Sequence, residues 1–328
     1  MDLSGVFPAL TTPFDSTGAV STAYLQENIR RYLQTGVAGF TVIGSTGESV
    51  LLTKQETDAV LAAAREAIPR EKRAIAGTGA ESTAETIQKT KRAAELGYDV
   101  ALVKTPHYYK PAYNARVFLE HYRRVADASP IPVMLYSVPV FTGVALEPPE
   151  VIALSEHPNI VGMKDSSGDL RRVVEIVAGA KPGFQLVTGA AAAVQPSLAA
   201  GAVGNILALA CVFPEKCAEL FEAQRAGQTA KARELQGMVA RLSRIVAGES
   251  IPGIKFAMDL RGYRGGLARP PLLPLQDEQK KRVTEAVMTA EPVASLVIFR
   301  FTGAREIGLI SGGAVARSLS FEGGGAAA

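Results

Sequence analysis

Cysteine, histidine and tryptophan are scarce in this chain of 328 residues, which has two cysteines, three histidines and no tryptophan. Cys211 and Cys217 form no CxxC pair, which argues against a disulfide framework and a structural zinc site, so we expect two reduced thiols in or near a helix. His107, His121 and His157 show no HExxH or comparable ligand spacing. We therefore expect no metal site.

The sequence also lacks long apolar runs and segregated charge. No apolar run approaches the ~20 residues of a membrane span, and the opening MDLSGVFPAL lacks the basic and apolar regions of a signal peptide. Lys and Arg exceed Asp and Glu by 35 − 32 = 3, without a basic stripe. These absences predict a cytoplasmic, soluble protein that binds neither nucleic acid nor a membrane.

The chain does contain a regular alternation of short apolar runs with longer amphipathic segments. Eight runs have β-type composition: GVFPAL, AGFTVIG, RAIAGTG, DVALVKTP, IPVMLYSVP, NIVGMKD, FQLVTGA and AVGNILALA. Segments with helical apolar spacing lie between them at Ser21–Thr35, Thr53–Ile68, Ser82–Leu96, Asn114–Ala128, Glu147–Glu156 and Leu170–Ala178. A repeated order of strand and helix predicts parallel strands joined by helical crossovers.

The nearly continuous apolar character of these runs indicates strands buried on both faces, as in a parallel sheet. Eight such units close an α/β (β/α)8 TIM barrel, which is the fold that we predict. An open doubly wound sheet is the alternative. Against it, no run is followed by a full GxGxxG fingerprint, since GTGAES at Gly77 has two of the glycines and lacks the third.

The chain changes in character after the eighth run. We predict a TIM-barrel catalytic domain over residues 1–226 and a C-terminal helical domain over residues 227–288, where the pattern is purely helical. Residues 289–328 change composition again and end in Gly and Ala, which predicts a flexible tail. Its stretch SLVIFRF either docks as a strand or stays exposed, where it would be an aggregation hazard.

The reactive groups of a TIM barrel lie at the C-terminal ends of its strands. Lys164, in PNIVGMKDSSGD, ends the sixth run. An amine desolvated in an apolar pocket becomes neutral more readily and can attack a carbonyl to form a Schiff base, whereas the alternative is an ion pair with Asp165. Tyr136 ends the fifth run and can act as a proton donor or acceptor, or simply pack.

The second run ends in GSTGES, at residues 44–49. Its glycines let successive backbone N–H groups converge on an anion, and Ser45 and Thr46 add hydroxyls. The phosphate-loop pattern GxxxxGK[ST] is absent, so the predicted ligand is a carboxylate and not a nucleotide. The alternative is an ordinary strand-to-helix turn with Glu48 in the first helical turn.

Five motifs in combination resemble the dihydrodipicolinate synthase/N-acetylneuraminate lyase family of pyruvate-dependent class I aldolases. They are GSTGES, TPHYYKP, LYSVP, VGMKDSSGD and IPGIKFAMDLRGY, and the resemblance spans residues 5–288. It implies a TIM barrel with a C-terminal helical domain, commonly assembled as a homotetramer of two tight dimers. It also implies chemistry through a covalent imine on lysine, with no separate cofactor.

The resemblance implies a role for individual residues. Lys164 would form the Schiff base with the 2-keto carbon of pyruvate or of a pyruvate-containing substrate. Tyr136 would transfer protons there, and Ser45 would link it to Tyr108, which in the family reaches into the site of the adjacent subunit. Ser45 and Thr46, with the backbone of their loop, would hold the pyruvyl carboxylate.

The resemblance also concerns the pocket wall. Gly189 and Ile206 would line it through backbone groups. The family's synthases carry an arginine that grips the carboxylate of aspartate semialdehyde, but this chain has Phe141, whose ring cannot form a bidentate carboxylate pair. Ala190 and Ala191 stand where synthases tend to have acidic residues. Both departures make the pocket for a second substrate more apolar.

The choice of substrate separates the remaining hypotheses. SPIPVMLYSVP, HPNIVGMKDSSGD and IPGIKFAMDLRGYRGG look most like the 4-hydroxy-2-oxoglutarate aldolase branch, which yields pyruvate and glyoxylate. The main prediction is therefore a lyase that cleaves a C–C bond to form pyruvate and an aldehyde. One alternative is a 4-hydroxy-tetrahydrodipicolinate synthase with a different carboxylate grip. The other is a non-catalytic barrel that binds a 2-keto acid.

Overall fold

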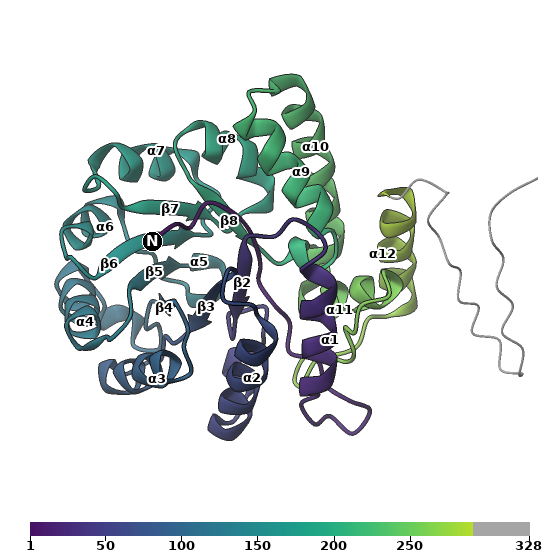
Figure 1. Cartoon of the computed structure of the whole chain (residues 1–328), viewed down its shortest axis with the longest axis horizontal. Coiled ribbons are helices and arrows are strands. Elements are labelled where there is room, and N and C mark those ends of the chain that lie inside the picture. The colour runs from purple at the N-terminus through teal and green to yellow at the C-terminus, as the bar shows by residue number, and fades with distance from the viewer. Residues whose placement is uncertain (291–328) are drawn as a thin grey trace, which may run out of the picture.

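The computed structural model describes residues 1–290, which form a ring of eight parallel strands surrounded by helices (Figure 1). The strands, each within one predicted run, are β1 (Gly5–Pro8), β2 (Gly39–Val42), β3 (Arg73–Gly77), β4 (Val100–Lys104), β5 (Val133–Ser137), β6 (Ile160–Asp165), β7 (Gln185–Thr188) and β8 (Gly204–Leu207). They pair in the order β1-β8-β7-β6-β5-β4-β3-β2, and a bridge from Ala9 to Thr41 joins β1 to β2. The predicted TIM barrel is confirmed, and the open doubly wound sheet is excluded.

Helices cover the outside of the ring. The six predicted segments correspond to α1 (Thr22–Tyr32), α2 (Lys54–Ala67), α3 (Thr83–Glu95), α4 (Ala115–Ala128), α6 (Pro148–Ser155) and α7 (Leu170–Gly179), the last of which runs one residue beyond its predicted end. Ser21, Thr53, Ser82 and Asn114 start the first four, because each side chain accepts a hydrogen bond from an N–H of the first turn. Outside the predicted segments lie the short α5 (Pro139–Thr142), α8 (Val194–Ala199) and the 3₁₀ helices η1 (Ser49–Leu51), η2 (Lys110–Ala112), η3 (Ala191–Ala193), η4 (Leu209–Cys211) and η5 (Ala247–Glu249).

Alternate residues of the strands fill the barrel interior. These side chains pack together in one buried hydrophobic cluster, which includes Phe7, Ile75, Leu102, Met134, Val187 and Ile206. The residues between them, such as Val103 and Leu135, face the helices. Lys104 and Tyr136 follow Leu102 and Met134 by two residues, so their side chains continue the interior rows at the strand ends. The alternation therefore directs these two side chains toward the mouth of the barrel.

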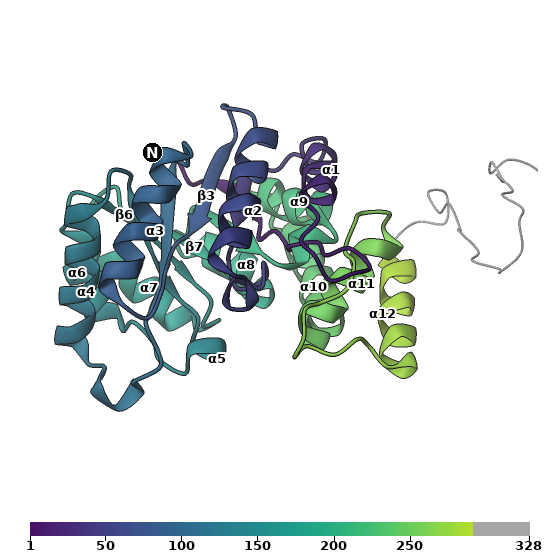
Figure 2. The ribbon, with the colours of Figure 1, turned by 90° about the horizontal axis from the view of Figure 1, so that it is seen from below.

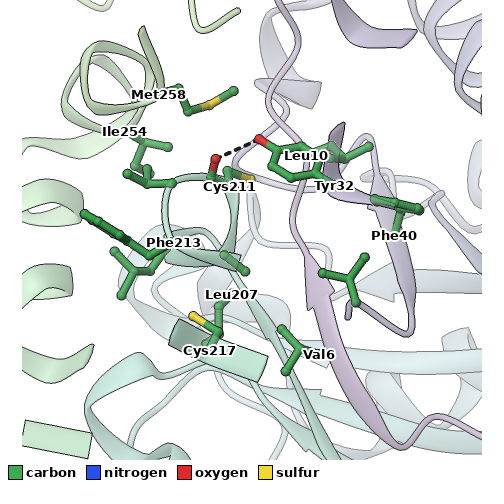
Figure 3. Close-up of a cluster of buried hydrophobic side chains, with 14 of the residues drawn as sticks. Val6, Leu10, Tyr32, Phe40, Leu207, Cys211, Phe213, Cys217, Ile254 and Met258 are labelled. Carbon is green, nitrogen blue, oxygen red and sulfur yellow. Dashed lines mark hydrogen bonds between the residues drawn. The ribbon is translucent and has the colours of Figure 1, made fainter. Parts of the chain in front are cut away.

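Four helices follow β8: α9 (Pro214–Arg225), α10 (Thr229–Val246), α11 (Ser250–Leu260) and α12 (Asp277–Ala290). In Figure 2 the last three gather on one side of the barrel. Met258 of α11 joins Leu10, Tyr32 and Cys211 in one hydrophobic cluster, where the Tyr32 hydroxyl donates to the Cys211 carbonyl at 2.7 Å (Figure 3). The C-terminal helices and the barrel therefore share a continuous core.

The predicted boundaries can be located on this fold. Gly227 lies in the turn between α9 and α10, and the division into two domains there stays a prediction. The helix α12 extends past residue 288 to Ala290. The predicted tail from residue 291 onward, with SLVIFRF, lies outside the described residues. Cys211 and Cys217 are free and buried in η4 and α9, as predicted. Within residues 1–290, no helix is long and apolar enough to cross a membrane.

Candidate active site

Lys164 points into the mouth of the barrel beside Tyr136. The parallel register aligns Lys104, Tyr136 and Lys164 on the neighbouring strands β4, β5 and β6. Lys164 is 5% exposed, and its Nζ lies 4.3 Å from the centre of the Tyr136 ring. The π face of a tyrosine attracts a cation, but it does not replace the hydration of an ammonium group. The site therefore contains a largely buried amine at a strand end.

The neighbouring carboxylate, Asp165, faces away from this amine. Its Oδ1 accepts hydrogen bonds from the backbone N–H of Ser167 at 2.7 Å and from the Ser167 hydroxyl, and its Oδ2 lies 3.4 Å from Nε of Arg172. Successive residues of a strand point to opposite faces, which separates the two side chains. Within residues 1–290, Lys164 forms no ion pair, so the alternative of a Lys164–Asp165 pair is wrong.

The phenol of Tyr136 faces the loop after β2. Its Oη lies 3.4 Å from Oγ of Ser45, and either hydroxyl can donate to the other. The Tyr136 ring itself is buried in the barrel interior cluster, which holds the phenol in place. An amine, a phenol and a serine hydroxyl thus meet at the barrel mouth from three strand ends, and two of these groups can exchange a proton.

The GSTGES loop that carries Ser45 is a tight turn. The N–H groups of Gly47 and Glu48 donate to the carbonyls of Gly44 and Ser45, both at 3.1 Å. In the described part of the chain, the N–H groups of Ser45 and Thr46 have no acceptor, so they are available to an anion. Glu48 has a left-handed backbone with φ of 56° and precedes η1. It therefore does not begin the helix that the alternative interpretation expects.

Gly189 directly follows β7, and Ile206 lies in β8, the next strand of the ring. A Cβ on Gly189 would lie 2.8 Å from Cε of Lys164 and 1.9 Å from Oγ of Ser166, so only glycine leaves room for the lysine stem. Ile206 is buried in the same interior cluster as Tyr136. Gly189 therefore lies beside the lysine stem, and Ile206 belongs to the interior cluster that also contains Tyr136.

Tyr108 is not joined to Ser45 within the described residues. Its side chain is 75% exposed and packs edge-to-face on Tyr109, with ring centres 5.0 Å apart. Its backbone N–H donates to Glu81. The link from Ser45 to Tyr108 that the resemblance implies is thus not formed within residues 1–290.

A cavity of about 830 Å³ extends from Ser45 and Tyr136 to the space between α2 and α3. Its wall includes Lys104, Glu81 and His107. The sequence pattern did not single out Lys104 or Glu81, and it considered His107 only as a possible metal ligand. Nδ1 of His107 lies 2.8 Å from Glu81, and Nζ of Lys104 lies 3.9 Å from the same carboxylate. Burial lowers the pKa of Lys104, and the Glu81 charge opposes this.

The three histidines are dispersed over the fold. His121 bonds to Thr83 through Nδ1, and Nε2 of His157 lies 3.0 Å from Asp127. Within residues 1–290, no group of three or more His, Cys, Asp and Glu side chains is placed to hold a metal ion.

Comparison with known proteins places this geometry in one family. The family model described as "Dihydrodipicolinate synthetase family" matches residues 2–290. A 4-hydroxy-tetrahydrodipicolinate synthase of Exiguobacterium is 36% identical over 285 residues, which cover 87% of this chain and 97% of the relative. A protein of Emericella nidulans named "Probable 4-hydroxy-2-oxoglutarate aldolase, mitochondrial" is 35% identical over 280 residues, which cover 84% of this chain and 91% of that one.

A solved structure agrees with this assignment. The dihydrodipicolinate synthase of Acinetobacter baumannii, crystallised in complex with pyruvate, has a TM-score of 0.83 and 31% sequence identity. The match covers 87% of this chain and 98% of that one. Most of the similar relatives carry the synthase name, and one carries the aldolase name at similar identity.

Proposed function

Because the chain belongs to the dihydrodipicolinate synthetase family and is a pyruvate-dependent lyase of the Schiff-base class, we propose that Lys164 is its imine-forming residue. The observation that carries this proposal is a buried amine at the barrel mouth, 4.3 Å from the Tyr136 ring and without a carboxylate partner in residues 1–290. A lysine amine is a nucleophile that can attack the carbonyl of a 2-oxo acid and form a Schiff base.

The reaction proceeds through a covalent imine. The Lys164 nitrogen bonds to C2 of the 2-oxo acid, and the carbonyl oxygen leaves as water. In the cleavage direction a base takes the proton of the C4 hydroxyl, the C3–C4 bond breaks, and its electron pair moves into the protonated imine to give an enamine. The aldehyde departs, the enamine carbon takes up a proton, and water releases pyruvate. The Tyr136 phenol, 3.4 Å from Ser45, is the proposed carrier of these protons.

The substrate carboxylate is assigned to the GSTGES loop. The N–H groups of Ser45 and Thr46 lack acceptors among the described residues, and the hydroxyls of both residues add further donors. Hydrogen bonds from several donors stabilise a carboxylate and orient it. We assign the wall of the substrate pocket opposite this loop to the backbone groups of Gly189 and Ile206. This arrangement would bring C2 of the substrate to the Lys164 amine.

The preferred substrate is 4-hydroxy-2-oxoglutarate, which would be cleaved to pyruvate and glyoxylate. The support comes from Phe141 in α5, a 62% exposed apolar side chain at the position where the family resemblance implies the carboxylate-binding arginine of the synthases. Ala190 and Ala191 add no charge after β7. A site with these side chains cannot grip aspartate semialdehyde in the manner of the synthases.

A 4-hydroxy-tetrahydrodipicolinate synthase is the second candidate. The names of most similar relatives favour it over the aldolase. It requires a different group to hold the carboxylate of the semialdehyde, since a phenyl ring cannot. The last alternative, a non-catalytic barrel, has no support from the similar relatives, which are named as synthases or as an aldolase.

Borohydride reduction tests the imine. Pyruvate with sodium borohydride should attach a reduced adduct to the protein, and peptide mass spectrometry should find it on Lys164. The Lys164→Ala variant should form no adduct and should lose turnover. An adduct on another lysine, or none in the parent, would refute the assignment.

A comparison of the two substrates tests the specificity. The kcat/KM of the parent protein should be higher for cleavage of 4-hydroxy-2-oxoglutarate than for condensation of pyruvate with aspartate semialdehyde. The cleavage is measured by pyruvate release. The Phe141→Arg variant should gain activity toward the semialdehyde relative to the parent. A parent that prefers the semialdehyde would establish the synthase instead.

The proposed assembly is a homotetramer of tight dimers in which Tyr108 completes the site of the partner. Its exposed ring and that of Tyr109, 75% and 68% exposed, support a contact with a second copy. Mixing Tyr108→Phe with Lys164→Ala should restore activity, because hybrid dimers contain one site with both intact residues. Light scattering that finds only monomers would exclude the assembly.

A further inference from the structure

Lys255 of α11 is the most deeply buried charged residue in the described chain. Its side chain has no exposed surface, and its Nζ lies 2.5 Å from Oε1 of Glu48. The same Nζ donates to the carbonyls of Thr12 and Leu267, at 2.7 and 2.8 Å, and lies 4.3 Å from the centre of the Phe14 ring. Burial lowers the pKa of Lys255, and the Glu48 charge opposes this. The lysine thus joins α11 to segments at the top of the barrel.

Glu48 belongs to the GSTGES loop and is held at both carboxylate oxygens. Lys255 faces Oε1, and the backbone N–H of Arg269 donates to Oε2 at 2.7 Å. Its φ of 56° lies in the left-handed region, which disfavours a residue with a side chain unless its surroundings hold it there. Both partners of Glu48 come from the C-terminal part of the chain. The conformation of the loop therefore depends on contacts from outside the barrel sequence.

Further contacts tie the same loop to its surroundings. The Thr12 hydroxyl donates to the carbonyl of Gly47 at 2.7 Å, while the Thr12 carbonyl accepts from Lys255. The guanidinium of Arg269 binds both carboxylate oxygens of Glu56 and the carbonyl of Leu51, just beyond the loop. The loop is thus held at Gly47 by Thr12, which also contacts Lys255, and the segment after the loop is held by Arg269 of the C-terminal part.

Stability alone is a weak reason for a buried ion pair. Desolvation of two charges offsets most of their attraction, and apolar residues of similar volume often serve a core as well. Glu48 of this pair lies two residues after Thr46, whose free N–H is part of the proposed carboxylate site. An ion pair is directional, so it can fix the orientation of a loop in a way that apolar contacts do not.

We infer that Glu48 and Lys255 form a positioning pair through which the C-terminal helices hold the carboxylate-binding loop in its active conformation. This inference rests on the proposed function of the loop. Neither residue touches the substrate. Loss of the pair should disorient the N–H groups of Ser45 and Thr46, weakening the capture of pyruvate while the Lys164 amine retains its reactivity.

The test is borohydride trapping of pyruvate on the full chain, followed by intact mass as pyruvate concentration increases. Glu48→Gln removes the charge, keeps the volume and retains an acceptor for Arg269. We expect its half-saturating pyruvate concentration to rise about tenfold, because the loss of one hydrogen bond to a charged group weakens binding by about that factor. The limiting trapping rate should change less. Lys255→Met should act in the same direction.

The double variant Glu48→Gln/Lys255→Met buries no unpaired charge, so it keeps the test open if a single variant does not fold. Val283→Ala is the matched control, because it removes buried volume from α12 without touching the loop. It should lower the unfolding midpoint and leave the half-saturating concentration unchanged.

The possible failures are distinguishable. A parent that forms no adduct would overturn both the proposed function and the positioning pair. A parent that forms the adduct, with folded pair variants that saturate at the same pyruvate concentration, would overturn the pair alone. An equal rise in Val283→Ala would also overturn it, since general destabilisation would then explain the effect.

Discussion

His121 should make the folded protein sensitive to mild acid. The ring lies on the buried face of α4 and is 5% exposed. Its Nδ1 bonds to the Thr83 hydroxyl at 2.9 Å, but its Nε2 has no partner in the described residues. Protonation would place an N–H with no acceptor and a charge in an apolar surrounding. Burial therefore lowers the pKa of His121 from 6.5 to about 4, with a small opposing effect from Glu81.

This pKa determines both the sign and the size of the effect. Between pH 6.5 and about 4 the unfolded chain binds a proton at His121 that the folded chain does not bind. The free energy of unfolding therefore falls as pH is lowered through this window, and the loss is complete below about pH 4. The difference in pKa corresponds to about 3 kcal/mol, since one pKa unit is worth about 1.4 kcal/mol.

His121→Asn isolates this contribution, because asparagine keeps a hydrogen-bonding group near the Nδ1 position and does not titrate. Urea unfolding at several pH values from 8 to 4 should show a smaller acid-induced loss in the variant, by up to about 3 kcal/mol. Thr83→Val serves as the control, since it removes the hydrogen bond but retains the buried ring. Its free energy of unfolding should fall with pH as steeply as that of the parent. If His121→Asn loses stability as steeply as the parent, the ring is not held neutral by burial.

Three further predictions follow from the geometry of the site and its surroundings. Gly189→Ala should abolish borohydride trapping on Lys164 by displacing the lysine stem, whose Cε would lie 2.8 Å from the new Cβ, while circular dichroism stays that of the parent. Tyr136→Phe should slow imine formation by about 10²-fold or more in stopped-flow kinetics without loss of the fold, since it removes only the phenolic proton carrier. Hydrogen bonds from Arg269 lower the pKa of Glu56 to about 2, so its stabilisation is present above pH 4.5 and is lost toward pH 2; Glu56→Gln should flatten acid unfolding in that range.

The strands and most helices could be predicted because each depends on local pattern. Strands buried on both faces read as continuous apolar runs, and capping residues such as Ser82 and Asn114 mark where helices begin. α5 has only four residues, and α8 carries Pro196 in a six-residue stretch, so neither shows helical periodicity. Elements this short depend on packing against their neighbours.

The candidate site was partly predictable for the same reason. A strand end is visible in the sequence, and the rule for TIM barrels directs attention to Lys164, Tyr136 and the GSTGES loop. Whether Lys164 pairs with Asp165 depends on which face each side chain takes, and this required the register of β5 and β6. The same register identified Lys104 as a part of the cavity wall.

Local pattern is enough to predict the barrel, its helices and the residue types at the strand ends, because periodicity and capping act over a few neighbouring residues. Which of these groups meet depends on how distant segments pack. Glu48 and Lys255 are distant in the chain and share no local pattern, yet they form a buried ion pair. The burial that lowers the pKa of His121 is likewise a property of packed helices. Contacts between distant segments depend on the closed ring and its docked helices, which no short stretch of sequence encodes.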